Sequence, residues 1–127
     1  MSKNIIPYGR QHINQDDIDA VVDVLKSNNL TQGPSIRKFE QEFSNYVGSK
    51  FAVAVSSGTA ALHLCAISLN LKPGDKVITT PLTFSASANC IKYCGGEVHF
   101  VDIDPETYLI DLNKLEKLLK ENPIGTF

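Results

Sequence analysis

The stretch FAVAVSSGTAALHL, residues 51–64, decides how this sequence folds. Residues 51–55 form an alternating apolar run, which is typical of a buried strand. The polar residues 56–59 follow at once, and a nearly all-apolar segment comes after them. We therefore predict a strand at 51–55, a polar turn, and a buried helix from residue 59 to about residue 69.

The same order of strand, turn and helix recurs further along the chain. Strand 76–80 leads into a helix at about 85–94, Gly95-Gly96 ends that helix, and strand 97–101 follows. Asp111 is placed to cap a last helix. Strands that alternate with helices at this spacing predict βαβ crossovers and a parallel sheet of an α/β fold.

The residues before 51 predict two helices. Asn14 is typical of an N-cap, and apolar residues recur after it at helical spacing. Loop 30–34 separates this helix from a second one, which Pro34 can begin and Gly48 can end. We predict a helical segment over 1–49 and a partial α/β domain over 50–127. The helix at 59–69 is apolar on nearly every face and needs cover on all sides, so the sequence is typical of the front of a larger domain.

Composition sets limits on location and partners. The 127 residues are 43% hydrophobic and 20% charged, with a formal net charge of -2, as expected of one globular domain. This charge gives no reason to expect nucleic acid or an acidic membrane surface as a partner. The first residues lack the apolar core of a secretory signal, and no apolar run is long enough to span a bilayer. The expected location is the cytoplasm.

Three cysteines raise the question of a metal site. Cys90 and Cys94 would share one face of a helix, like half of such a site, but neither Cys65 nor His63 and His99 complete it with a recognisable ligand spacing. We predict no metal and interpret the cysteines as small buried hydrophobic residues.

The turn Ser56-Ser57-Gly58-Thr59 has two interpretations. It is an ordinary helix N-cap, or it is a phosphate site in which backbone N–H groups and hydroxyls meet an anion. Its position at the carboxyl end of a parallel strand favours a ligand, because α/β proteins bind ligands at that edge. Both interpretations stay open on local chemistry.

Two further segments leave strands at the same edge. Phe84, in the segment Thr79–Ser87, could stand beside the first turn and stack on a flat ring, although taken alone it is more simply interpreted as an ordinary core residue. Asp102 and Asp104 could face a cation or a ring nitrogen. Because Asp104 precedes Pro105, we interpret it as a turn former.

Four motifs in order resemble the DegT/DnrJ/EryC1/StrS family of fold-type-I, pyridoxal-phosphate-dependent sugar aminotransferases. They are Ile6-Pro7-Tyr8-Gly9-Arg10, Leu30-Thr31-Gln32-Gly33-Pro34, Ser57-Gly58-Thr59-Ala60-Ala61-Leu62-His63 and Pro81-Leu82-Thr83-Phe84-Ser85-Ala86-Ser87-Ala88-Asn89. The first two look closest to the branch that makes the pseudaminic acid precursor. That branch aminates a UDP-linked 4-keto-6-deoxy-N-acetylhexosamine with glutamate.

The resemblance implies roles for particular residues. Gly58, Thr59 and Ala60 would bind the phosphate of pyridoxal phosphate, and Phe84 would stack on its pyridine ring. The nucleotide sugar would lie near a second set of residues: Tyr8, Thr31 and Gly33. The resemblance also implies a homodimer with shared active sites, and a first strand, 51–55, whose neighbour comes from later in the chain.

The resemblance also shows what this chain lacks. The family's Schiff-base lysine and the acid that pairs with the pyridine nitrogen lie downstream of the region matched here, and no lysine of this chain fits that lysine motif. We expect the chain alone to be an inactive N-terminal part of the enzyme, of marginal stability because strand 51–55 lacks its partner. The alternatives are a non-catalytic phosphate- or nucleotide-binding module and an inert remnant.

Overall fold

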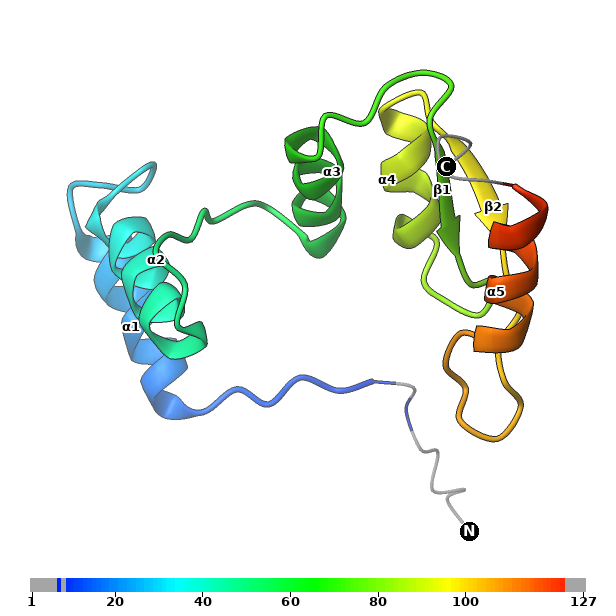
Figure 1. Cartoon of the computed structure of the whole chain (residues 1–127). Coiled ribbons are helices and arrows are strands. Elements are labelled where there is room, and N and C mark those ends of the chain that lie inside the picture. The colour runs from blue at the N-terminus through cyan, green and yellow to red at the C-terminus, as the bar shows by residue number, and fades with distance from the viewer. Residues whose placement is uncertain (1–6, 8, 123–127) are drawn as a thin grey trace, which may run out of the picture. The chain divides into compact units, whose positions relative to one another are not determined.

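A computed structural model describes residue 7 and residues 9–122 of the chain. The chain divides into two compact units, residues 1–54 and 55–127, which are described separately. Among the described residues, the first unit contains two helices, and the second contains three helices and two strands. Figure 1 shows these elements.

The first unit contains α1 (Gln15–Lys26) and α2 (Pro34–Val47). Asn14 caps α1 through a capping box: its side chain accepts the Asp17 N–H at 3.0 Å, and the Asp17 carboxylate accepts the Asn14 N–H at 2.9 Å. Pro34 begins α2, and Gly48 ends it with a left-handed φ of 69°. The predicted caps of both helices are confirmed.

The predicted strand at 51–55 is wrong for this chain. The segment is extended but belongs to no strand, and the Phe51 and Val53 side chains are 76% and 75% exposed. A strand needs a neighbouring strand to receive its backbone hydrogen bonds. The described residues supply none here, and side chains take two of the backbone groups instead. The Glu40 carboxylate accepts the Ala54 N–H at 2.8 Å, and the Ser49 hydroxyl donates to the Phe51 carbonyl at 2.8 Å.

The second unit has the predicted alternation of helices and parallel strands. Its elements are α3 (Gly58–Ser68), β1 (Lys76–Thr79), α4 (Ala86–Tyr93), β2 (Glu97–Phe100) and α5 (Leu112–Glu121). The strands pair in parallel, from Lys76 opposite Glu97 to Thr79 opposite Phe100, and α4 packs on both strands and on α3. The helices α3, α4 and α5 all begin at the end of the unit where β1 and β2 finish (Figure 1). The predicted α/β class is confirmed, and the described residues form two of the three predicted strands.

Tandem glycines join α4 to β2 in a tight turn. Gly95 has a φ of 80°, and a Cβ added there would lie 2.9 Å from the Pro73 ring. A Cβ on Gly96 would lie 2.9 Å from the Ile91 side chain and 3.1 Å from the Asp75 carbonyl oxygen. That carbonyl accepts the Glu97 N–H at 2.7 Å, so the turn leads directly into the β1–β2 ladder. Glycine is required at both positions for conformation or space.

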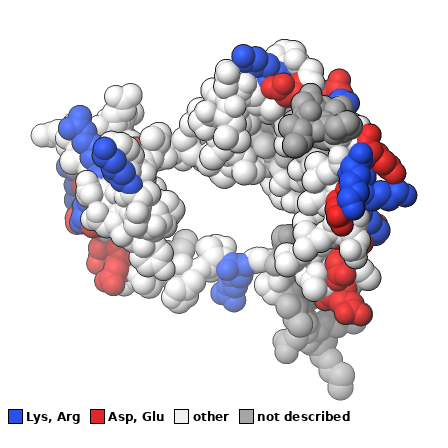
Figure 2. All heavy atoms as spheres, viewed as in Figure 1, with Lys and Arg blue, Asp and Glu red and all other residues white. Residues whose placement is uncertain are grey.

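The core of the second unit is small. Its buried apolar residues lie on α3, on α4 and just after β2, and they are Ala66, Ala86, Cys90, Ile91 and Val101. Helix α3, which we expected to need cover on all sides, packs on α4 and exposes Leu62, Leu64 and Ile67. Figure 2 shows charged side chains gathered over the region of α5, whereas α3 carries no Asp, Glu, Lys or Arg. The chain thus leaves much of its most apolar helix uncovered.

The cysteines behave differently from one another. Cys90 is buried as predicted, Cys94 is half-buried, and Cys65 is exposed, because its face of α3 is among those that α4 leaves uncovered. Within residues 7 and 9–122, no group of three or more His, Cys, Asp or Glu side chains could hold a metal ion. No helix in this part of the chain is long and apolar enough to cross a membrane.

Candidate functional site

The candidate site begins at the N-terminus of α3, within the polar turn 56–59. Ser57 is the N-cap, with extended backbone angles of φ -164° and ψ 162°, and its hydroxyl accepts the Ala60 N–H at 3.2 Å. The Ser57 carbonyl accepts the Ala61 N–H at 3.0 Å. The N-cap interpretation of this turn is therefore correct, and the helix starts one residue earlier than predicted.

The cap leaves two backbone donors of α3 available. Among the described residues, the N–H groups of Gly58 and Thr59 have no hydrogen-bond acceptor. A Cβ added to Gly58 would meet no atom within 4 Å, so the space beside the turn is open. Two free N–H groups at the positive end of an 11-residue helix, with the Thr59 hydroxyl beside them, have the chemistry that binds a phosphate dianion.

Ala60 is a less available donor than the sequence suggested. Its N–H already bonds to the Ser57 hydroxyl, so a phosphate oxygen would have to displace that hydroxyl or share the N–H with it. The N-cap and the anion site are thus compatible at Gly58 and Thr59 but compete at Ala60. The turn fits a phosphate through two donors rather than three.

Phe84 belongs to the segment between β1 and α4. Figure 1 shows this segment at the same end of the unit as the start of α3. Its side chain is 74% exposed, so the alternative of an ordinary core residue is excluded in this chain. The segment is held by local bonds: the Phe84 carbonyl accepts the Ser87 N–H at 3.0 Å, and the Thr83 and Ser87 hydroxyls are 2.9 Å apart. An exposed aromatic ring at this end of the unit is available for stacking.

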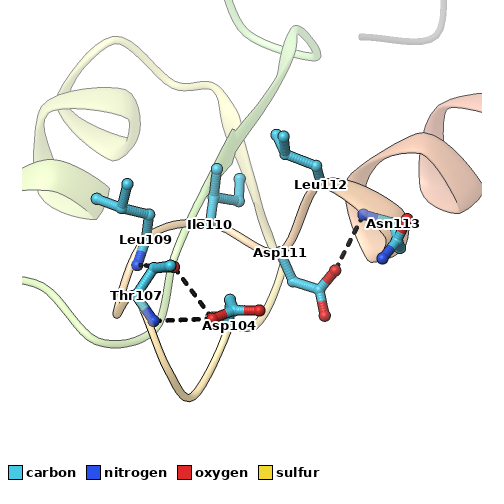
Figure 3. A pocket seen from close by; sticks show the side chains of 7 residues that line it. All are labelled: Asp104, Thr107, Leu109, Ile110, Asp111, Leu112 and Asn113. Atoms are coloured by element: carbon cyan, nitrogen blue, oxygen red, sulfur yellow. Dashed lines mark hydrogen bonds between the residues drawn. The ribbon is translucent and has the colours of Figure 1, made fainter.

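The acidic loop after β2 is closed by its own bonds. The Asp104 carboxylate accepts the Glu106 N–H at 2.9 Å. It also accepts the Thr107 N–H at 2.8 Å and the Thr107 hydroxyl at 3.1 Å (Figure 3). The Thr107 N–H, followed by that of Glu106, holds the pKa of Asp104 below its ordinary value of 3.8. Asp104 is thus a turn former, as predicted.

Asp111 and Asp102 are also engaged. The Asp111 carboxylate caps α5 by accepting the N–H groups of Asn113 at 2.9 Å and Lys114 at 3.1 Å. The Lys114 ammonium then lies 3.4 Å from Asp111 and 3.5 Å from Asp102. The carboxylates that leave β2 therefore fix the loop and the start of α5, and the anion-binding chemistry of this end lies at α3.

A comparison with protein families shows one to which the sequence of this chain is similar. Residues 11–123 match the DegT/DnrJ/EryC1/StrS aminotransferase family, which is nearly the whole chain. The chain belongs to this family. The match includes three of the four motifs on which the resemblance was based, and the first motif, residues 6–10, lies just before it.

Similar proteins include one named for polysaccharide biosynthesis and one named as a transaminase. The spore coat polysaccharide biosynthesis protein SpsC of Bacillus subtilis is 46% identical over 113 residues, which are 89% of this chain and 29% of SpsC. A UDP-4-amino-4,6-dideoxy-N-acetyl-beta-L-altrosamine transaminase of Campylobacter jejuni is 42% identical over 118 residues, 93% of this chain and 31% of that protein. The chain therefore spans less than a third of the length of these relatives.

Solved structures in the family have the same fold over this region. The putative sugar aminotransferase Spr1654 of Streptococcus pneumoniae, in its PLP-form, matches with a TM-score of 0.82 and 36% identity over 88% of this chain and 29% of that chain. The same protein is known in a PMP-form, which matches equally well. The predicted fold, that of the N-terminal part of such an aminotransferase, is thus confirmed.

The residues predicted from the DegT/DnrJ/EryC1/StrS motifs are divided between the two units. Gly58, Thr59, Ala60 and Phe84 lie in the second unit. Thr31 and Gly33 lie in the first, where Gly33 is the N-cap of α2 and a Cβ added to it would lie 2.9 Å from the Asn29 Cβ. Gly33 is therefore needed for a tight turn. Tyr8 lies outside the described residues.

Sequence reasoning missed Glu40. Its carboxylate bonds to the Ala54 N–H across 14 residues, shortly before the α3 turn. The only signal in the sequence is an acidic residue on a helix face between apolar positions, which does not distinguish it from an ordinary solvated side chain. Its partner is a backbone group, so no pairing of residue types could have shown the bond.

Proposed function

We propose that this chain is the phosphate-binding N-terminal part of a pyridoxal-phosphate-dependent sugar aminotransferase. The observation that carries the proposal is the pair of N–H groups of Gly58 and Thr59 at the start of α3, which have no hydrogen-bond acceptor among the described residues. Membership of the family supports the cofactor phosphate as the anion that would occupy this place. Pyridoxal phosphate, when bound, supplies an electron sink for amino-group transfer.

The residues of the chain would hold the cofactor at two points. Gly58 and Thr59 would donate backbone N–H groups to the phosphate, the Thr59 hydroxyl would add a donor, and Ala60 would join when the Ser57 hydroxyl yields its N–H. Phe84 would stack on the pyridine ring with its exposed face. Because the helix dipole and the donors are in place before binding, little reorganisation would be needed at the phosphate.

The substrate of the complete enzyme would be a UDP-linked 4-keto-6-deoxy sugar, with glutamate as amino donor, in surface glycan biosynthesis such as that of pseudaminic acid. The similarity to a UDP-altrosamine transaminase supports this class, as does 37% identity over 121 residues to a UDP-4-amino-4-deoxy-L-arabinose–oxoglutarate aminotransferase of Shewanella sediminis. Tyr8, Thr31 and Gly33 would lie near the nucleotide sugar. The complete enzyme would be a cytoplasmic homodimer.

The chain taken alone would not catalyse transamination. None of its lysines fits the family's Schiff-base motif: Lys72, Lys76 and Lys92 lie in a turn, at a strand start and near a helix end. The test is incubation with pyridoxal phosphate, glutamate and a UDP-4-keto sugar, followed by borohydride reduction and peptide mapping. We expect neither aminated sugar nor stoichiometric labelling of one lysine. Either of these would contradict the proposed inactivity.

Phosphate binding is tested with pyridoxamine 5'-phosphate, which has no aldehyde to react with surface lysines. We expect it to shift the backbone amide resonances of Gly58 and Thr59 and the ring protons of Phe84 in the 127-residue chain. Pyridoxamine, which lacks the phosphate, should leave the amides unchanged. If inorganic phosphate binds equally well and Phe84 does not respond, the alternative of a non-catalytic phosphate-binding module is favoured.

A matched pair of variants isolates one donor. Gly58→Pro removes the N–H at the first helical position, where proline is well tolerated, and Gly58→Ala keeps it. Open space around Gly58 accommodates either side chain. We expect Gly58→Pro to weaken binding about tenfold, because a hydrogen bond to a charged group is lost, and Gly58→Ala to bind like the wild type. Equal affinities of the two variants would contradict the site.

A further inference from the structure

The chain reverses direction after α2 and returns along that helix. Gly48 makes the left-handed turn, and the Ser49 N–H then donates to the Ser44 carbonyl at 2.9 Å. Ser44 is only 3% exposed, and its hydroxyl is satisfied by the Gln41 carbonyl at 2.9 Å. A small residue one turn before the helix end allows the returning backbone to lie close to α2.

One turn further back on α2, Glu40 holds the end of this returning segment. Its Oε1 atom accepts the Ala54 N–H at 2.8 Å, and the bond is partly buried. A charged acceptor makes this bond stronger than a neutral one, and partial removal from water strengthens it further. The segment 49–54 is thus fixed at both ends, by the cap at Gly48 and by Glu40.

The second fixed end lies immediately before the proposed phosphate turn. Only Val55 and Ser56 separate Ala54 from the N-cap Ser57. Fixing the backbone of one residue costs about 1–2 kcal/mol of conformational free energy, so a long free segment before the turn would raise the cost of ordering it around a ligand. With Ala54 held, two residues rather than eight are left to order between Gly48 and Ser57.

We propose that Glu40 is a positioning residue for the phosphate turn, and that it acts through the Ala54 N–H without touching the ligand. The inference rests on the proposed function, since it concerns the same site. Glu40 restricts the backbone that enters the turn and so preorganises the N–H groups of Gly58 and Thr59. Removing its carboxylate would weaken phosphate binding without removing a donor from the site.

The test compares three variants of the 127-residue chain. Glu40→Ala removes the acceptor, and Glu40→Gln keeps a neutral acceptor at the same distance. Glu42→Ala, the matched control, removes an exposed carboxylate of the same helix that pairs only with Lys38, at 3.8 Å. Measured are amide exchange at Ala54, the amide resonances of Gly58 and Thr59 without ligand, and the affinity for pyridoxamine 5'-phosphate.

In Glu40→Ala we expect exchange at Ala54 and the dissociation constant each to rise about tenfold, and the Gly58 and Thr59 resonances to move. Exchange across α1 and α2 should stay at its wild-type rate. Glu40→Gln should recover most of the affinity, and Glu42→Ala should match the wild type. An unchanged affinity in Glu40→Ala, with Ala54 released, would overturn the proposal.

Two remaining outcomes are also decisive. If Glu40→Ala unfolds α1 and α2, Glu40→Gln replaces it as the test, and a folded Glu40→Gln that binds no ligand overturns the role of the acceptor. If the wild type itself fails to bind pyridoxamine 5'-phosphate, the proposed function fails. The role of Glu40 is then tested on the ligand-free chain. If the Gly58 and Thr59 resonances do not move in Glu40→Ala, the positioning role is overturned. If they move, it is supported.

Discussion

The N-termini of α3 and α5 lie at the same end of the second unit but are capped in different ways (Figure 1). At α3 the neutral Ser57 hydroxyl accepts one N–H, and two others have no acceptor within the part of the chain that the structure describes. At α5 the Asp111 carboxylate accepts two N–H groups and also pairs with Lys114. The carboxylate fills the α5 end with charge from the chain itself. The hydroxyl leaves the α3 end electrostatically positive and open to an external anion.

The largest expected effect comes from giving α3 the cap of α5. Ser57→Asp would place a carboxylate against the proposed phosphate, and repulsion between like charges at contact distance costs several kcal/mol. We expect the affinity for pyridoxamine 5'-phosphate to fall about a hundredfold or more. Titration followed by ligand fluorescence measures this. Ser57→Asn, a neutral cap of the same size, should lose less than about tenfold. Similar losses in both variants would show that charge does not distinguish the two helix ends.

A second difference between the two ends is the exposed ring that accompanies α3. Phe84→Ala should weaken pyridoxamine 5'-phosphate binding about tenfold, because stacking of aromatic rings contributes about 0.5–1.5 kcal/mol beyond the area it buries. The thermal unfolding midpoint should barely change, since the side chain is already exposed. Inorganic phosphate, which has no ring, should bind Phe84→Ala and wild type equally. A loss of phosphate binding as well would assign Phe84 to the structure of the turn.

Low pH should weaken the N-cap of α5 and leave the N-cap of α3 unchanged. The Lys114 N–H above all, with that of Asn113, holds the pKa of Asp111 below its ordinary value of 3.8. Because the pKa of Asp111 is lower in the folded state than in the unfolded state, the ionised carboxylate stabilises α5 at pH values above the unfolded-state pKa. This contribution is lost as pH falls below 3.8 through the lowered folded-state pKa. The Ser57 hydroxyl does not titrate there.

The measurement follows amide resonances between about pH 5 and pH 2. Those of Asn113 and Lys114 should move with a midpoint below 3.8, while that of Ala60 stays in place. Asp111→Asn should abolish the movement at α5. A transition of the same midpoint at Ala60 would mean that the two helix ends respond together and are not independent caps.

The smallest expected effect is that of removing the hydroxyl cap alone. Ser57→Ala should lower the free energy of unfolding by about 1 kcal/mol, as is typical for loss of a serine N-cap. It should also free the Ala60 N–H for a ligand. Chemical denaturation measures the first effect, and the amide shift of Ala60 on addition of pyridoxamine 5'-phosphate measures the second. An unchanged stability would show that the Ser57 bond to Ala60 contributes little.

Much of this arrangement was predictable because its causes are local. Asn14, Gly48 and Asp111 cap helices through bonds within a few residues, so residue type and spacing were sufficient. The crossover through α4 likewise follows from the alternation of strands with a helix and from Gly95-Gly96. Strand 51–55 failed because strand formation depends on a neighbour, and an alternating apolar pattern carries no information about whether one is present.

The candidate site likewise has local features that the sequence predicts and non-local features that it does not. The turn at Ser57–Thr59 could be found from its residues, because a helix N-terminus is local. How many of its donors remain available depends on the direction of one hydroxyl, and the sequence does not specify this. Glu40 could not be found, because its bond spans 14 residues and ends on a backbone atom.

The two glycines after α4 also restrict how β2 can pair with β1. If β2 slipped by one residue along β1 in one direction, Glu97 would replace Gly96 against the Asp75 carbonyl oxygen, where even a Cβ comes within 3.1 Å. A slip in the other direction would bring Cys94 to the place of Gly95, where a Cβ comes within 2.9 Å of the rigid Pro73 ring. Either error also turns the side chains of β2 to the wrong face. The tandem glycines thus oppose a slip of β2 by one residue in either direction.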